Sequence, residues 1–139
     1  MSDAFPITIF HNPKCGTSRN TLAMVQAAGY APTVVEYMAA GWSEAVLKDL
    51  LAASGMTARE LLREKSTPAD LQGLLAPETS DDEIIAAMVE HPILVNRPIV
   101  RTPLGTKLCR PSEQVLELLE WRPESFTKED GEVVKVSQA

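Results

Sequence analysis

The chain has 139 residues, of which 45% are hydrophobic, and a net charge of −6 at pH 7. This size and composition predict a single domain, residues 1–139, with a substantial core. The acidic balance argues against a nucleic-acid binder or a protein of anionic membrane surfaces, and no apolar run is long enough to span a bilayer. With two cysteines and no signal-peptide pattern at the N-terminus, we expect a cytoplasmic protein without a disulfide framework.

The N-terminal segment is typical of a strand–helix–strand unit. Residues 7–10 predict a strand, a helix follows from Thr17 or Ser18 to Ala28, and Gly29 ends it. Residues 33–37 predict the second strand. Such a unit implies a parallel strand pair with a right-handed crossover.

A helical block without strand signals follows over about residues 44–90. Ser43 is expected to cap a helix over residues 44–54, and Thr57 to cap a shorter one over 58–63. Residues 70–76 are weakly helical, and a further helix is expected from Ser80 or Asp81 to Glu90.

The C-terminal segment predicts strands and one last helix. Residues 93–95 read as an apolar strand, residues 99–102 and 106–109 as a hairpin, and residues 113–121 as a helix. Without the helical block, this order is that of an α/β fold with a thioredoxin-like core, a mixed four-stranded sheet. We therefore predict a helical insertion at about 44–90, a surface tail at about 123–139 and a cis Arg97–Pro98 bond facing Cys15.

Cys15 stands where the first strand turns into the first helix. A helix N-terminus carries a partial positive charge and free N–H groups, so it favours an anion such as a thiolate or a bound oxyanion. Lys14 and Arg19 flank it and add positive charge. We predict a nucleophilic cysteine that meets a small anionic substrate, although an unreactive buried cysteine is the other interpretation.

Several neighbouring residues limit the chemistry of Cys15. Ser18 occupies the position where a dithiol loop has its second cysteine, and Cys109 is expected to serve only packing. Turnover through a disulfide would then need an external thiol such as glutathione or a glutaredoxin. Thr21 occupies the position where a tyrosine-phosphatase loop requires arginine, which disfavours that mechanism.

Three arginines are candidates for binding an oxyanion: Arg63, Arg97 and Arg110 each follow or precede an element end. For each of them a solvated surface role stays open. His11 could stabilise the thiolate or be a hydrogen-bonded turn residue. The histidines and cysteines are too scattered to predict a metal site.

Four stretches carry a resemblance: HNPKCGTSRNTL (11–22), ELLR (60–63), HPILVNRPIVRTPLGTKLCRPSEQVL (91–116) and FTKEDGE (126–132). Together they resemble the glutaredoxin-linked arsenate reductases. The resemblance implies a thioredoxin-like core with a helical insertion, no bound cofactor, and Cys15 as the nucleophile that attacks arsenate. It further implies glutathione as cosubstrate and glutaredoxin as the partner that resolves the mixed disulfide.

The same resemblance assigns the neighbouring residues. Arg63, Arg97 and Arg110 match the oxyanion-binding arginines. His11 matches the histidine that helps lower the pKa of the nucleophile, and Ser18 a residue that supports the thiolate. Two alternatives remain. Spx-type regulators share the fold and bind RNA polymerase, but Ser18 interrupts their usual Cys-x-x-Cys switch. A related thiol-dependent reductase would act on another oxyanion.

Overall fold

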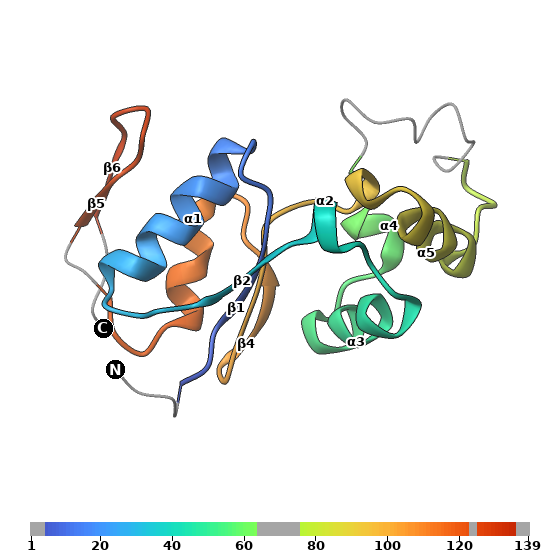
Figure 1. Cartoon of the computed structure of the whole chain (residues 1–139), viewed down its shortest axis with the longest axis horizontal. Coiled ribbons are helices and arrows are strands. Elements are labelled where there is room, and N and C mark those ends of the chain that lie inside the picture. The colour runs from blue at the N-terminus through green and yellow to red at the C-terminus, as the bar shows by residue number, and fades with distance from the viewer. Residues whose placement is uncertain (1–4, 64–75, 123–124, 136–139) are drawn as a thin grey trace. The chain divides into compact units, whose positions relative to one another are not determined.

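The computed structural model describes residues 5–63, 76–122 and 125–135. The chain divides into two units, one formed by residues 1–36 and 97–139 and the other by residues 37–96 (Figure 1). The weak helix predicted over residues 70–76 lies outside the described residues except for Ala76.

The first unit is built on a mixed four-stranded sheet with the strand order β2-β1-β3-β4. β1 (Thr8–His11) pairs in parallel with β2 (Thr33–Glu36) and antiparallel with β3 (Ile99–Thr102). β3 pairs antiparallel with β4 (Gly105–Leu108) in the predicted hairpin. The prediction of a mixed sheet built from a strand–helix–strand unit and a hairpin is therefore confirmed.

Helices α1 (Gly16–Ala27) and η2 (Ser112–Leu118) pack against each other beside this sheet (Figure 1). Alternate residues Ile7 and Ile9 of the first strand segment are buried, as the period of two in a strand requires. They share one apolar cluster with residues of α1, β3 and η2: Met24, Val25, Val100, Val115, Leu116, Leu118 and Leu119. This cluster fixes the N-termini of α1 and η2, beside which the candidate residues Cys15 and Arg110 lie.

The predicted helix over residues 113–121 is present but shorter than predicted, because η2 is a 3-10 helix that ends at Leu118. Backbone bonds from Gln114 N–H to Pro111 O and from Leu119 N–H to Leu116 O have the tighter i to i+3 spacing. The residues at 115, 116, 118 and 119 are buried, and this spacing fits an α-helix as well as a 3-10 helix. The apolar pattern therefore did not distinguish the two helix types.

The predicted strand over residues 93–95 is also wrong. Residues Pro92–Leu94 form a 3-10 turn, η1, and Val95 makes only an isolated bridge to Leu62. Pro92 at the first position fixes φ for a helical turn, which the apolar run alone did not reveal.

The second unit consists mainly of helices, as predicted: α2 (Tyr37–Ala40), α3 (Glu44–Ser54), α4 (Ala58–Leu61), α5 (Asp81–Glu90) and η1. Ser43 caps α3 by accepting from Val46 N–H, and Gly55 ends it with φ of 75°. Thr57 and Ser80 each open a capping box. Within the described ranges no helix is long and apolar enough to cross a membrane.

The predicted surface tail contains a β-hairpin, hereafter the tail hairpin (residues 125–135), formed by β5 (Ser125–Thr127) and β6 (Val133–Lys135). Phe126 and Val134 are partly buried against the core cluster of the first unit. Gly131 has φ of 95°, which lets the turn close between the two strands.

The Arg97–Pro98 bond is cis, which confirms the prediction. The Arg110–Pro111 bond is cis as well and was not predicted.

Candidate active site

Cys15 is the N-cap residue of α1, directly before the first helical residue, Gly16, so the helix begins one or two residues earlier than the predicted Thr17 or Ser18. The Cys15 N–H donates to Asn12 O at 3.0 Å, and the Lys14 N–H donates to the Asn12 side-chain oxygen at 3.0 Å, so Asn12 closes the turn. No acidic residue lies in the first turn of α1. The positive end of the helix is therefore not neutralised by an acidic residue of its own first turn.

Two of the three predicted arginines lie at this sulfur. Arg110 Nη1 lies 3.8 Å from Cys15 Sγ and also donates to Arg97 O at 2.9 Å. The Arg97 side chain acts on the same sulfur through its charge and through a hydrogen bond. Residues 95 positions apart are thus brought together, which spacing in the sequence could not show.

The Cys15 thiol has a lowered pKa even though the residue is only 6% exposed. Burial by itself would raise the pKa of the thiol. Two features outweigh burial and hold the pKa below its ordinary value of 9.0: the Ser18 backbone N–H and the guanidinium groups of Arg97 and Arg110. The interpretation of Cys15 as an unreactive apolar residue is therefore not supported.

Cys109 provides the contrast within the same chain. It is fully buried in the apolar core cluster, and burial raises the pKa of its thiol to about 12. The predicted packing of Cys109 in the apolar interior is confirmed.

His11 and Ser18 form a buried pair behind the nucleophile. Ser18 Oγ and His11 Nδ1 share a hydrogen bond of 2.6 Å, and the Asn12 N–H donates to the same Oγ at 3.0 Å. Burial lowers the pKa of His11; Glu36 opposes this and Arg19 adds to it. Burial thus disfavours the positively charged form of His11, and the hydrogen bond ties its ring to Ser18 in the first turn of α1.

Arg63 belongs to the other unit, two residues after the end of α4, where its backbone N–H donates to Leu94 O at 2.7 Å. Its role in oxyanion binding stays a prediction from the resemblance.

Sequence reasoning missed Glu129 as a neighbour of this loop. Arg19 was expected to add positive charge beside Cys15, and Glu129 accepts two hydrogen bonds from its guanidinium, at 3.1 and 2.7 Å. Arg19 and Glu129 are 110 positions apart, so no local pattern predicted the pair.

We expect the two thiols to differ sharply in their reaction with iodoacetamide. Only the thiolate reacts, and the pKa of Cys15 is lowered while that of Cys109 is about 12. In the folded protein at neutral pH, Cys15 should be alkylated and Cys109 spared. The pH midpoint of Cys15 alkylation should lie below that of a free cysteine. Mass spectrometry of digested samples measures both sites, and denatured protein, in which the thiols should react alike, is the control.

The mixed sheet, with a cysteine capping its first helix, defines a thioredoxin-like thiol protein. Residues 10–118 match the ArsC family, and the chain belongs to that family.

Relatives and solved structures agree with this placement. The chain is 57% identical to an arsenate reductase of Rhizobium meliloti, over 92% of both chains. It is 50% identical to an arsenate reductase of Escherichia coli strain K12, again over 92% of each. Among solved structures, an arsenate reductase from Vibrio cholerae superposes with a TM-score of 0.79 at 40% identity, covering 83% of this chain and 98% of that one.

Proposed function

We propose that this protein is an arsenate reductase in which the Cys15 thiolate is the nucleophile. The observation that carries the proposal is the position of the Cys15 sulfur at the start of α1, with Arg110 Nη1 3.8 Å away and Arg97 beside it. Identity of 50–57% to arsenate reductases over 92% of the chain supports arsenate as the substrate. The Spx-type alternative has no comparable support, because Ser18 replaces the second cysteine of its switch.

The first chemical step joins sulfur to arsenic. The Cys15 thiolate attacks As(V), an arsenate hydroxyl group takes up a proton from solvent and leaves as water, and a cysteine–arsenate adduct forms. Glutathione then attacks the Cys15 sulfur, so the S–As bond breaks and its electron pair passes to arsenic. The products are arsenite, As(III), and a Cys15–glutathione disulfide. Glutaredoxin removes the glutathione by thiol–disulfide exchange and returns Cys15 to the thiol.

The surrounding residues have separate roles in this proposal. Arg97 and Arg110 neutralise the arsenate dianion and hold its oxygens, since guanidinium forks match tetrahedral oxyanions. For Arg63, the same role is proposed from the resemblance alone. Ser18 stabilises the thiolate through its backbone N–H, and His11 fixes the Ser18 hydroxyl through Nδ1.

Glutathione and glutaredoxin are proposed as the reducing partners, because Ser18 leaves no local resolving cysteine and Cys109 is buried in the core. Such a thiol cycle suits the cytoplasm, where disulfides are kept reduced. We also propose that residues 1–139 form one thioredoxin-like domain, with the helical segment of about 44–90 inserted and a tail from about residue 123.

A reconstituted assay tests the function. Arsenate, glutathione, glutaredoxin and this protein together should produce arsenite, with oxidation of glutathione followed through glutathione reductase and NADPH. Omitting glutathione or glutaredoxin should stop turnover, and phosphate should inhibit without being reduced. Arsenite production that persists without glutathione would refute the proposed cycle.

A further inference from the structure

The tail hairpin contacts both segments that carry the candidate active-site groups of the first unit. Cys15 is the N-cap residue of α1, and Arg19 lies four residues later. Glu113 lies in the first turn of η2, three residues after Arg110. Two consecutive residues of the tail hairpin form ion pairs with these segments. Lys128 pairs with Glu113, and Glu129 pairs with Arg19.

On the α1 side, Glu129 is joined to the loop of the nucleophile through Arg19. The Arg19 guanidinium donates to both Glu129 carboxylate oxygens and, through Nη1, to Pro13 O at 2.8 Å. The Glu129 N–H donates to Asn20 Oδ1 at 3.1 Å. A Cβ atom on Gly16 would lie 3.3 Å from Glu129 Oε1, so the tail hairpin comes into contact with the residue next to Cys15.

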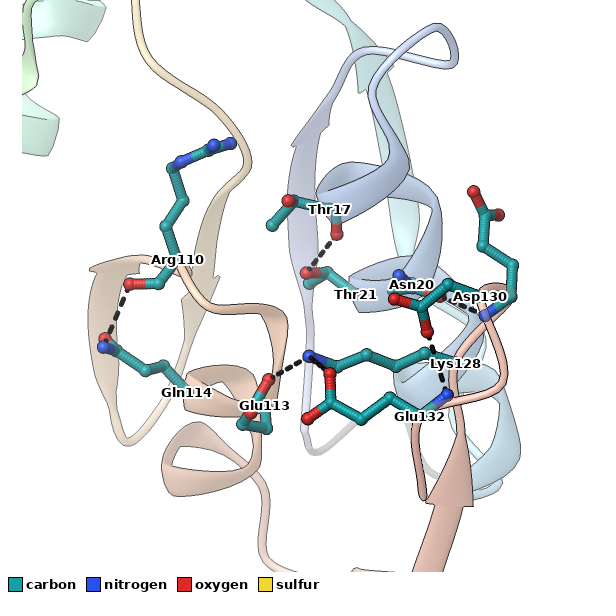
Figure 2. Close-up of polar contacts among 10 residues, drawn as sticks. Thr17, Asn20, Thr21, Arg110, Glu113, Gln114, Lys128, Asp130 and Glu132 are labelled. Atoms are coloured by element: carbon teal, nitrogen blue, oxygen red, sulfur yellow. Dashed lines mark hydrogen bonds and ion pairs between the residues drawn. The ribbon is translucent and has the colours of Figure 1, made fainter. Parts of the chain in front are cut away.

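On the η2 side, Lys128 Nζ lies 2.8 Å from Glu113 Oε1 and 3.4 Å from Glu132 Oε1 (Figure 2). The Lys128 side chain is only 11% exposed, so this pair is better sheltered from solvent than a typical surface ion pair. One residue further along η2, Gln114 Nε2 donates to Arg110 O at 3.1 Å (Figure 2). The first turn of η2 is thereby tied both to the tail hairpin and to Arg110.

We propose that the tail hairpin is a brace for the active site, in which Glu129 and Lys128 act as positioning residues that hold the Cys15 loop and the Arg110 segment at their working separation. This inference rests on the proposed function, because it gives Cys15 and Arg110 their roles as nucleophile and oxyanion donor. Neither Glu129 nor Lys128 needs to touch arsenate. They act through Arg19 and Glu113, and a small misplacement of reacting groups costs a large factor in rate.

The decisive variant is Glu129→Gln, because a pure charge effect and loss of the brace would shift the pKa of Cys15 in opposite directions. If Glu129 acted only through its negative charge, removing that charge would lower the pKa of Cys15 and improve arsenate binding. Loss of the brace instead moves Arg110 and the loop amides away from the sulfur. We expect the pKa of Cys15 to rise by roughly half a unit, and kcat/KM for arsenate to fall about tenfold.

A second variant and a matched control complete the design. Lys128→Met keeps the aliphatic stem and should reduce kcat/KM similarly, and exchanging the charges, Lys128→Glu with Glu113→Lys, should restore most of it. Glu117→Gln is the control, since it breaks an ion pair between Lys107 of β4 and the same helix η2 without touching the tail hairpin. Phe126 and Val134 still pack on the core in all these variants, so we expect each to fold.

The readouts are the pH profile of Cys15 alkylation, arsenate kinetics and circular dichroism. A pKa of Cys15 that falls or stays constant in Glu129→Gln would overturn the brace, as would equal losses in Glu117→Gln. The alkylation profile requires no arsenate. If the brace proposal is wrong, the pKa of Cys15 will not rise in the Glu129→Gln variant. If arsenate is not the substrate, arsenite production will be absent although the pKa still shifts.

Discussion

Replacing Cys15 by serine is expected to abolish arsenite production, lowering kcat/KM by roughly a thousandfold or more, as removal of a nucleophile commonly does. A serine hydroxyl does not ionise near neutral pH and cannot form the mixed disulfide with glutathione that the cycle requires. The glutaredoxin-coupled assay measures the loss. Mass spectrometry after exposure to oxidised glutathione should find the adduct on wild-type Cys15 and none on the variant.

Cys109→Ala is the matched control for this experiment. Cys109 is fully buried in the core and its thiol has a pKa of about 12, so it should contribute packing and no chemistry. This variant should keep near-normal kcat while losing some thermal stability, because a small cavity replaces the sulfur. Retained turnover in Cys15→Ser, or its loss in a folded Cys109→Ala, would reverse the assignment of the two thiols.

Replacing Arg110 by alanine is expected to lower kcat/KM for arsenate roughly 10- to 150-fold, the equivalent of one charge-assisted hydrogen bond of about 1.5–3 kcal/mol. Arg110 serves two purposes, because its Nη1 faces the Cys15 sulfur and its guanidinium is placed to meet the oxyanion. The variant should therefore need more arsenate, and the pKa of Cys15 should rise toward its ordinary value. Steady-state kinetics and the pH profile of alkylation measure these two effects separately.

Two further variants show whether charge or geometry matters. Arg110→Lys keeps the positive charge but lacks the planar fork, so we expect the pKa of Cys15 to stay low while arsenate affinity remains poor. Arg101→Ala removes an exposed arginine of β3 and should leave both measurements near wild type. If Arg101→Ala and Arg110→Ala weaken arsenate binding equally, a general field of positive charge would explain the binding better than a built site.

The sequence predicted the local elements well where short-range rules decide them. The strand before Cys15, the helix after it and the caps at Ser43, Thr57 and Ser80 were all predictable, because each depends on neighbouring side chains and on turn residues. The wrong strand at residues 93–95 and the overlong helix at 113–121 fall on short apolar runs, whose pattern does not distinguish a strand, an α-helix and a 3-10 helix.

The sequence by itself determined that Cys15 would begin a helix and that no second thiol would lie nearby in the chain. Those facts depend on residues within one or two helical turns of each other, so the order of the chain suffices. Only the tertiary structure decided which distant groups meet that sulfur. Arg110 reaches it and Glu129 reaches Arg19 because the sheet and the packing of η2 on α1 bring together segments about a hundred residues apart. The lowered pKa of Cys15 comes from the Ser18 backbone N–H at the helix end and also from that meeting of distant arginines, so the sequence could propose a thiolate but only the fold could assemble its surroundings.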